Sequence, residues 1–442
     1  MTELDRSSTM PGYYPSAWPC ECGGPRRQKT AAGPGFNLQP GDQLKATTRR
    51  LDGRWPVMFV QRDAGELYLQ GGALPFQGEE SYGWLEKVDP ITLEPIVQSG
   101  KLPSGGHNWC GAVVVHENGD LYVTNGRYCH RLSPDCDVVA ERELPKDCGY
   151  NGLLILSDGN LIMKDIQLSE PSHFSVLEPE KLSEVDRLQF PENSVGRISV
   201  DYTADGEFVY ATSDTRVYRL AYADGKLELD DGWISSYDVP GDDQSFAWDT
   251  CMGEDSVWFM DMGGASGALA MLCARPIGTA PISSPPTATG PQHVFRVSTI
   301  DPNDRDVLTP FGLPNGGIIA PPLYEQESHV LVAYDSNNGK LGAWRYGGPG
   351  ELDELWVRDV KNYMQPMLFA ETMELIVNDA QADGDYVAVL DLETGEERGR
   401  VHSGAPRLTG MFFCPGWNRD VYYATILGQV GRTYVAGSGP RQ

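Results

Sequence analysis

The residues best suited to chemistry gather in one short stretch of the chain. Residues 106–132, GHNWCGAVVVHENGDLYVTNGRYCHRL, contain three histidines and two cysteines. Imidazole and thiolate groups are preferred zinc ligands, and a paired Cys and His can form a nucleophile. The stretch therefore suggests either a metal or catalytic site, or a structural unit that contains these residues incidentally.

The strand pattern of this stretch separates its histidines. AVVV is apolar and β-branched, ENGD carries an Asn-Gly hairpin signal, and LYVT alternates, which predicts successive antiparallel strands. His107 and His116 then lie about 25–30 Å apart along one strand, and His130 lies two strands further out. Cys110 lies three positions after His107 and points to the opposite face. Only His107 remains a candidate, and we expect no metal at His116, His130, Cys129 or Cys136.

The second strand of this unit recurs along the chain. The copies are ELYLQG at 66, DLYVTN at 120, NLIMKD at 160, EFVYAT at 207, SVWFMD at 256, VLVAYD at 330, ELIVND at 374 and DVYYAT at 420. Units of four strands with a period in the forties are typical of β-propellers. The sequence therefore predicts an all-β chain with a single eight-bladed β-propeller, and seven blades are the alternative.

The units also divide the chain into regions. Residues 43–442 form the propeller, and QLKATTRRL (43–51) supplies the missing outer strand of the last blade beside TYVAG (433–437). Residues 1–42, rich in Pro, Gly and aromatic residues, form an arm that we expect to lie over the surface. A Pro-rich insertion at about 275–292 predicts a surface loop or a lid.

The composition limits the partners. The chain has 62 acidic and 35 basic residues, a formal charge of -27, which disfavours nucleic acid and anionic membranes. We see no secretory signal and no apolar run long enough to span a membrane, so we expect a soluble cytoplasmic protein. Nine scattered cysteines indicate free thiols, and the pair in CEC (Cys20, Cys22) is too short for a zinc half-site. The oligomeric state stays open.

One column of the inner strands breaks the apolar pattern of the repeat. Its members are Phe59, Val113, Leu153, Val200, Asp249, Leu323, Met367 and Phe413. A buried carboxylate costs several kcal/mol unless it is paired or neutralised. Asp249 therefore needs a partner, a metal or a raised pKa, or else it faces a watery channel.

Polar and aromatic residues gather near the starts of the inner strands. They are His107, Asn108, Asn151, Arg197, Gln365 and Arg407, with Trp109, Tyr150 and Trp248 nearby. Such a mixture at one end of a channel is typical of a small-molecule pocket, although ordinary channel lining is the alternative. The second strands often end in Asp, as at Asp165 and Asp261, which indicates turn caps or, in addition, metal ligands.

Three segments resemble known propeller families. AYDSNNGKLGAW (333–344) and LDLETGEERGR (390–400) resemble the tryptophan-docking pattern of quinoprotein-dehydrogenase-like propellers, in which it packs blades. The adjacent-cysteine pair of many quinone-binding members is missing, so we expect no quinone. YNGLLILSDGNLIMKD (150–165) is similar to the Asn-Gly segment of gluconolactonase and SMP-30 propellers. That resemblance implies that Asn151 helps to bind a divalent cation.

The polar exceptions on the inner strands favour an enzyme that acts on a small molecule at the channel mouth, and three functions remain open. The first is a lactonase-like hydrolase in which Asn151, Asp165 and Asp261 hold calcium or a similar cation, and Asp249 or His107 acts as base. Arg197 then steadies the oxyanion, and the substrate is held by five residues: Trp109, Tyr150, Trp248, Gln365 and Arg407. The second is a metal-free lyase or isomerase. The third is a non-catalytic binding or scaffold propeller, which would concentrate its distinctive residues on the outer rim. No dinucleotide fingerprint is present, so we expect neither nicotinamide nor flavin.

Overall fold

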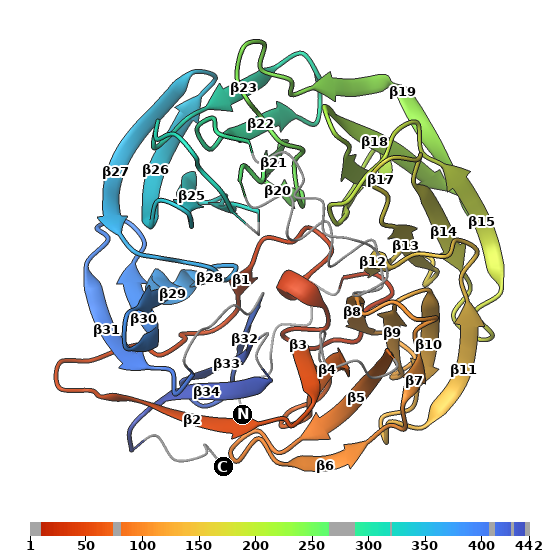
Figure 1. Ribbon diagram of the computed structural model, residues 1–442, viewed down its shortest axis with the longest axis horizontal. Coiled ribbons are helices and arrows are strands. Elements are labelled where there is room, and N and C mark those ends of the chain that lie inside the picture. The colour runs from red at the N-terminus through yellow and green to blue at the C-terminus, as the bar shows by residue number, and fades with distance from the viewer. Residues whose placement is uncertain are drawn as a thin grey trace.

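The described residues form a closed ring of β-sheets. The computed structural model describes residues 10–73, 81–264, 288–318, 321–405, 412–425 and 428–437. Eight sheets surround a central channel (Figure 1). Within these residues the helical elements are two short 3-10 turns, η2 (Glu21–Gly23) and η3 (Ala370–Thr372). The predicted eight-bladed β-propeller is confirmed, and the seven-bladed alternative is wrong.

Each blade has four antiparallel strands, and blades 1 to 8 are numbered along the chain. The inner strands are β3 (Arg54–Gln61), β8 (Cys110–Val115), β12 (Tyr150–Ile155), β16 (Ser199–Thr203), β20 (Cys251–Met252), β24 (Leu323–Glu325), β28 (Met367–Phe369) and β32 (Phe413–Pro415). The second strands are β4 (Leu67–Ala73), β9 (Leu121–Asn125), β13 (Leu161–Asp165), β17 (Gly206–Thr212), β21 (Ser256–Met260), β25 (Val330–Asp335), β29 (Glu374–Gln381) and β33 (Asp420–Thr425). The third strands are β5 (Tyr82–Val88), β10 (Tyr128–Leu132), β14 (His173–Leu177), β18 (Arg216–Ala223), β22 (Val294–Ser298), β26 (Lys340–Gly348), β30 (Gly384–Asp391) and β34 (Gln429–Val435). The outer strands are β6 (Pro95–Gln98), β11 (Val138–Glu143), β15 (Glu184–Gln189), β19 (Lys226–Ser236), β23 (Arg305–Leu308), β27 (Glu351–Asp359), β31 (Glu397–His402) and β2 (Leu44–Arg50). Blade 1 also carries the short strand β7 (Leu102–Pro103), which pairs with β5.

The burial of a strand depends on its distance from the channel. β8 and β9 are buried along their whole length, whereas β11 alternates between exposed and half-buried residues. Both faces of the inner strands pack against neighbouring blades, so these strands need continuous apolar runs such as AVVV. Outer strands meet water and can carry charge.

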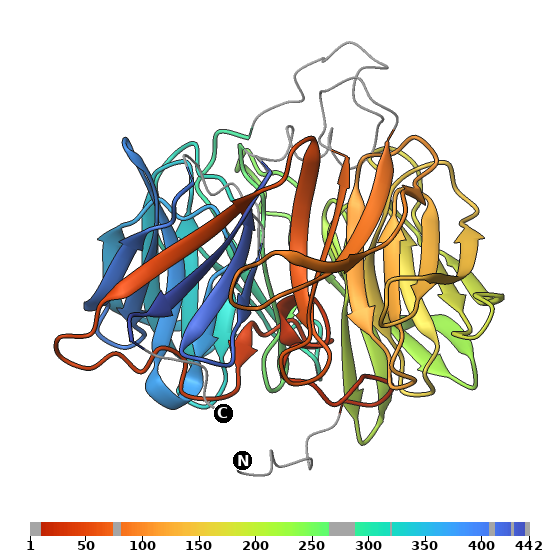
Figure 2. The ribbon, with the colours of Figure 1, turned by 90° about the horizontal axis from the view of Figure 1, so that it is seen from below.

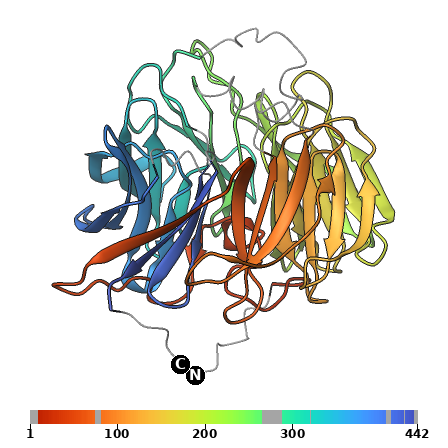
Figure 3. The same cartoon turned by 60° about the horizontal axis from the view of Figure 1, so that its bottom comes forward.

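The ring closes through the strand predicted for this purpose. β2 pairs antiparallel with β34, from Leu44 opposite Val435 to Arg50 opposite Gln429 (Figure 3). The last blade thus combines both ends of the chain. This pairing covers the edge that β34 would otherwise leave open.

Tyrosines near the start of the second strand link successive blades. In three places the phenol donates a hydrogen bond to a proline carbonyl in the turn before the outer strand of the next blade. The pairs are Tyr68 with Pro134, Tyr122 with Pro179, and Tyr422 with Pro90, at 2.9, 2.9 and 3.0 Å. The repeated units therefore provide hydrogen bonds that join neighbouring blades.

The N-terminal arm does not lie over the surface, as we expected from its composition. It forms isolated bridges to the lower ends of blade 2, Tyr13 to His116 and Cys20 to Val114. Its strand β1 (Thr30–Ala31) then adds in parallel to β28. In Figure 1 the short red helix η2 lies near the middle of the ring, and Figure 2 shows the arm entering from the lower side. The arm fills the channel because its buried residues, Trp18 and Phe36 among them, find apolar partners there.

Candidate functional site

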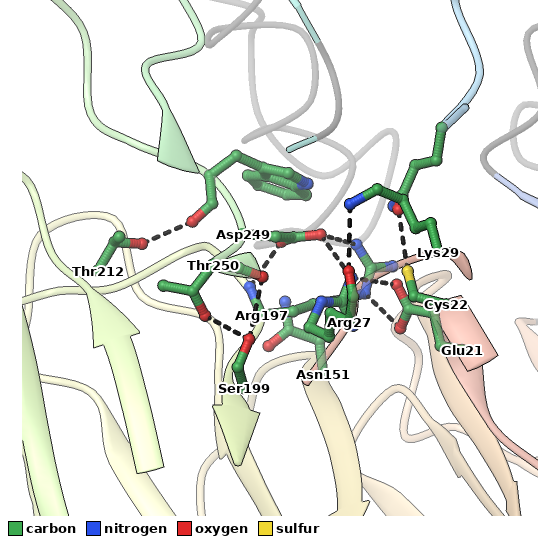
Figure 4. Close-up of polar contacts among 12 residues, drawn as sticks. Glu21, Cys22, Arg27, Lys29, Asn151, Arg197, Ser199, Thr212, Asp249 and Thr250 are labelled. Atoms are coloured by element: carbon green, nitrogen blue, oxygen red, sulfur yellow. Dashed lines mark hydrogen bonds and ion pairs between the residues drawn. The ribbon is translucent and has the colours of Figure 1, made fainter. Parts of the chain in front are cut away.

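Four charged side chains meet inside the channel, and two of them come from the arm. Arg27 Nη2 donates to Glu21 Oε1 at 2.6 Å and to Asp249 Oδ2 at 2.8 Å (Figure 4). Arg197 Nε lies 3.1 Å from Glu21 Oε2, and its Nη1 lies 3.5 Å from Asp249 Oδ2. We call these four residues, Glu21, Arg27, Arg197 and Asp249, the channel cluster.

The channel cluster is balanced in charge and almost completely buried. Its side chains are at most 1% exposed. Removing one partner from such a buried pair typically costs about 3–5 kcal/mol, because a charge is left in an apolar interior. The backbone amide of Arg197 adds a further hydrogen bond to Asp249 Oδ1 at 2.7 Å. Each charge is therefore held by the others.

The arm adopts an unusual backbone where it reaches the cluster. Cys22, Arg27 and Lys29 have φ of 61°, 55° and 60°, in the left-handed region. A residue with a Cβ loses about 1–2 kcal/mol there, and such strain persists only where surrounding contacts compensate for it. The ion pairs of Arg27 provide such contacts.

Asp249 has the partner that its position in the apolar column required. That partner is Arg27, together with Arg197, which the sequence had indicated only as a group that steadies an oxyanion. Asp249 does not face a watery channel, since its side chain is 0% exposed. The predicted base is thus one half of a structural ion pair in this arrangement.

Arg197 lies among aromatic rings. Its guanidinium carbon lies 5.1 Å from the ring centre of Trp109, 5.9 Å from Trp248 and 5.4 Å from Phe412. Such cation–π contacts favour the charged guanidinium. Two of the predicted substrate residues, Trp109 and Trp248, thus contact the predicted oxyanion group, and both are buried.

The remaining predicted pocket residues are divided among other contacts. His107 Nε2 lies 3.1 Å from Asp147 Oδ1, and this hydrogen bond is the main cause that lowers the pKa of Asp147. Tyr150 Oη accepts from the backbone amide of Lys146 at 3.0 Å. Gln365 Oε1 accepts from the thiol of Cys22 in the arm at 2.9 Å. Two further predictions lie outside the described residues, namely Arg407 and most of the Pro-rich insertion.

Two of the three predicted metal ligands, Asp165 and Asp261, use their oxygens elsewhere. Asp165 Oδ1 accepts from the backbone amide of His173 at 2.6 Å, at the start of β14. Asp261 Oδ1 likewise accepts from the amide of His293 at 3.0 Å, and burial raises the pKa of Asp261. In both cases the carboxylate caps the connection from the second strand to the third.

Asn151 does not fit a divalent cation in this arrangement. Its Nδ2 donates to Val195 O at 2.9 Å, and its Oδ1 has no hydrogen-bond partner in the described part of the chain. Its register partner on β13 is the buried Lys164, so an ammonium group shares its face of the sheet. Across the described ranges, no group of three or more His, Cys, Asp or Glu side chains could hold a metal ion. A cation prefers oxygen ligands without a neighbouring positive charge.

The histidines of residues 106–132 lie apart from one another, as predicted. His116 Nε2 bonds to Gly159 O at 2.9 Å, which joins blade 2 to blade 3. His130 is buried in β10, with Glu141 Oε2 3.3 Å from its Nε2. These residues belong to the blades.

Sequence reasoning missed the arm residues of the site. They lie in CECGGPRRQK (20–29), where three acidic or thiol residues precede three basic ones. Charges in a Pro- and Gly-rich arm were the available signal. From the sequence, the pair in CEC was only judged too short for a zinc half-site.

Comparisons of the sequence assign no family to the chain, because no protein-family model and no curated protein matches it. No helix among the described residues is long and apolar enough to cross a membrane.

Solved structures resemble the chain across most of its length. The quinohemoprotein alcohol dehydrogenase from Comamonas testosteroni is 11% identical, with a TM-score of 0.63, over 96% of this chain and 81% of that one. A europium-containing methanol dehydrogenase is 9% identical, with a TM-score of 0.59, over 94% and 90%. BamB from Moraxella catarrhalis is 13% identical, with a TM-score of 0.54, over 90% and 99%. At these identities the likeness concerns the fold alone, which is the β-propeller.

Proposed function

We propose that this chain is a non-catalytic propeller that binds a protein partner on its outer surface. The observation that carries the proposal is the ion pair between Arg27 and Asp249 inside the channel. The chain's own arm thus occupies the position where a substrate of a propeller enzyme would meet its base. A rigid ring whose centre is occupied by the arm is suited to bind a partner with its outer surface.

The space beside the arm supports this choice. The cavity between the arm and blades 7 and 8 measures about 10 Å³, roughly the space of one water molecule. Small-molecule sites are usually about 300–1,000 Å³. A lactonase-like hydrolase, a lyase or an isomerase would need the arm to move before a substrate reached Asp249.

The outer rim carries the exposed apolar side chains that a binding propeller needs. All the large exposed hydrophobic residues among the described ranges lie on outer strands or in the turns that lead into them. They are Ile91, Ile96, Val138, Val139, Val185, Ile300, Val307 and Val357. Ile96 and Ile300 are 61% and 78% exposed. Branched aliphatic residues at such positions can anchor a partner.

The charge of the chain indicates the kind of partner. At a formal charge of -27, the protein repels acidic surfaces and attracts basic ones. A partner with a basic surface and apolar anchors therefore fits best.

A turnover assay tests the catalytic alternatives. Wild-type protein and Asp249→Asn are compared on a panel of lactones and esters, with and without calcium. We expect no turnover that depends on Asp249. Turnover by the wild type that disappears in Asp249→Asn would overturn the proposal and favour the hydrolase.

A crosslinking experiment in the source cells tests the binding role. A photo-reactive residue at Ile96 or Val139 should give one discrete adduct with another protein. The adduct should disappear with a second substitution, Val138→Asp, that leaves the melting temperature unchanged. The matched control places the same residue at the exposed Lys181. Absence of discrete adducts from all outer-strand positions would refute a scaffold role.

A further inference from the structure

The small cavity in the channel lies between the arm and the inner strands of blades 7 and 8. Its walls are Trp18, Cys22, Lys29, Gln365, Pro366, Met367, Phe412 and Phe413. At about 10 Å³ it has room for roughly one water-sized particle. Two of the residues that line it, Lys29 and Gln365, carry an ammonium group and an amide group.

Lys29 brings a charge that the channel cluster does not balance. Its side chain is buried, and its Nζ donates to Pro322 O at 2.7 Å and to Arg27 O at 3.1 Å. An ammonium group has three donors, so one remains. In the described part of the chain no carboxylate forms an ion pair with Lys29, because Glu21 and Asp249 are used by the two arginines.

Gln365 presents its amide nitrogen without a partner. Its side chain is 2% exposed, and its Nε2 has no hydrogen-bond partner among the described residues. Burial raises the pKa of the Cys22 thiol to about 12, so the thiol stays protonated and donates to Gln365 Oε1. This hydrogen bond fixes the amide of a residue that lines the cavity, and it leaves the Nε2 donors without a partner among the described residues.

These features require an acceptor of negative charge. A buried unpaired ammonium costs several kcal/mol, and an unsatisfied buried amide costs about 1–3 kcal/mol more. A water molecule would satisfy the amide but would leave the positive charge unbalanced. A monatomic anion satisfies both within the volume of the cavity.

We propose that this cavity binds a single halide-sized anion, with chloride as the natural occupant, between Lys29 Nζ and Gln365 Nε2. The anion then joins Lys29 of the arm to Gln365 of blade 7, beside Phe412 of blade 8. By joining them, the anion stabilises the position of the arm in the channel. This site is independent of the outer-surface binding proposed above.

Thermal melting at constant ionic strength tests the proposal, with sodium chloride replacing sodium gluconate, whose anion is too large for the cavity. A ligand that binds only the folded state raises the melting temperature, and above its dissociation constant the rise continues with the logarithm of its concentration. We expect this chloride dependence in the wild type and in the matched surface variant Lys181→Met. Lys29→Met should lose it.

A second variant keeps the test decisive if Lys29→Met fails to fold. Gln365→Glu places a carboxylate opposite Lys29 and replaces the anion, so its melting temperature should not depend on chloride. Crystals grown with bromide should show one anomalous peak in the cavity. A wild-type melting temperature that ignores chloride, unchanged chloride dependence in Gln365→Glu, or bromide crystals without this peak would each overturn the proposal.

Discussion

The walls between blades and the centre of the channel are equally buried but are built from opposite chemistry. Tyr122 and Val123 of β9 lie in a wall of apolar side chains, which the repeat renews in every blade. The centre instead contains Arg27 and Asp249, charges that occur once and are contributed by distant parts of the chain. A wall is stabilised by area removed from water, whereas the centre depends on each charge finding its specific partner. The two regions should therefore respond differently to substitution.

Removal of the arm should have the largest effect. A chain that begins at Gln43 keeps β2 and the closure of blade 8, but it removes Arg27 from Asp249 and Glu21 from Arg197 and exposes the apolar channel lining. We expect loss of a single cooperative unfolding transition, measured by calorimetry, and aggregation in size-exclusion chromatography.

The control for this prediction is a chain that begins at Met10. It should melt like the full-length protein, because the described arm is intact. Normal folding of the chain that begins at Gln43 would show that the centre contributes little to stability.

Single charge removals at the centre should follow in size. Arg27→Met and Asp249→Asn should each lower the free energy of unfolding by about 3–5 kcal/mol, since each leaves one uncompensated charge in the buried channel cluster. From the sequence alone, Asp249→Asn could have been silent or even stabilising. Its ion pair with Arg27 reverses that expectation.

A double-mutant cycle in urea measures the coupling. Arg27→Met combined with Asp249→Asn should cost clearly less than the sum of the two single changes. Additive costs would show that the two side chains do not interact, and that the centre does not depend on specific charge partners.

The same contrast explains what the sequence could predict. The period of the second strands and the apolar inner column were enough for eight blades and for β2 beside β34, because repeated local patterns determine them. The polar exception at Asp249 correctly required a partner. Arg27 could not be identified, because it lies 222 residues away in an arm without a repeat.

The expected metal site shows a different limit. Asn151 was assigned from the likeness of one segment to another family, and that segment does not specify what surrounds it. The structure places buried Lys164 opposite Asn151, and uses Asp165 and Asp261 to cap strand connections. Side chains that share a face across strands depend on register, which a segment alone does not give.

A charged histidine in a wall between blades should destabilise the folded protein, in contrast to the paired charges at the centre. Burial lowers the pKa of His130 in β10 to about 4. The neighbouring Glu141 does not offset this effect, because it is 40% exposed and water screens the pair. The unfolded chain takes up a proton near pH 6.5, whereas the folded protein does so only near pH 4. Stability should therefore fall as pH decreases from about 6.5 to 4, by up to about 3 kcal/mol.

Urea unfolding across this pH range measures the effect. His130→Gln removes the titrating group, so its stability should change less steeply with pH than that of the wild type. Parallel pH profiles for the two proteins would contradict the pKa of about 4.

The smallest effect should come from the hydrogen bonds that join blades. Tyr122→Phe removes one phenol that donates to Pro179 O and accepts from Asn118 Nδ2, both at 2.9 Å. Pro179 is half-buried and Asn118 is exposed, so water can satisfy both groups after the change. The loss should be about 1 kcal/mol, as for a typical hydrogen bond. Because Tyr68 and Tyr422 make the same contact at other blade junctions, Phe at all three should cost the sum of the single losses in urea unfolding. A cost well above that sum would show that the junctions act together, and that the walls share the cooperativity assigned here to the centre.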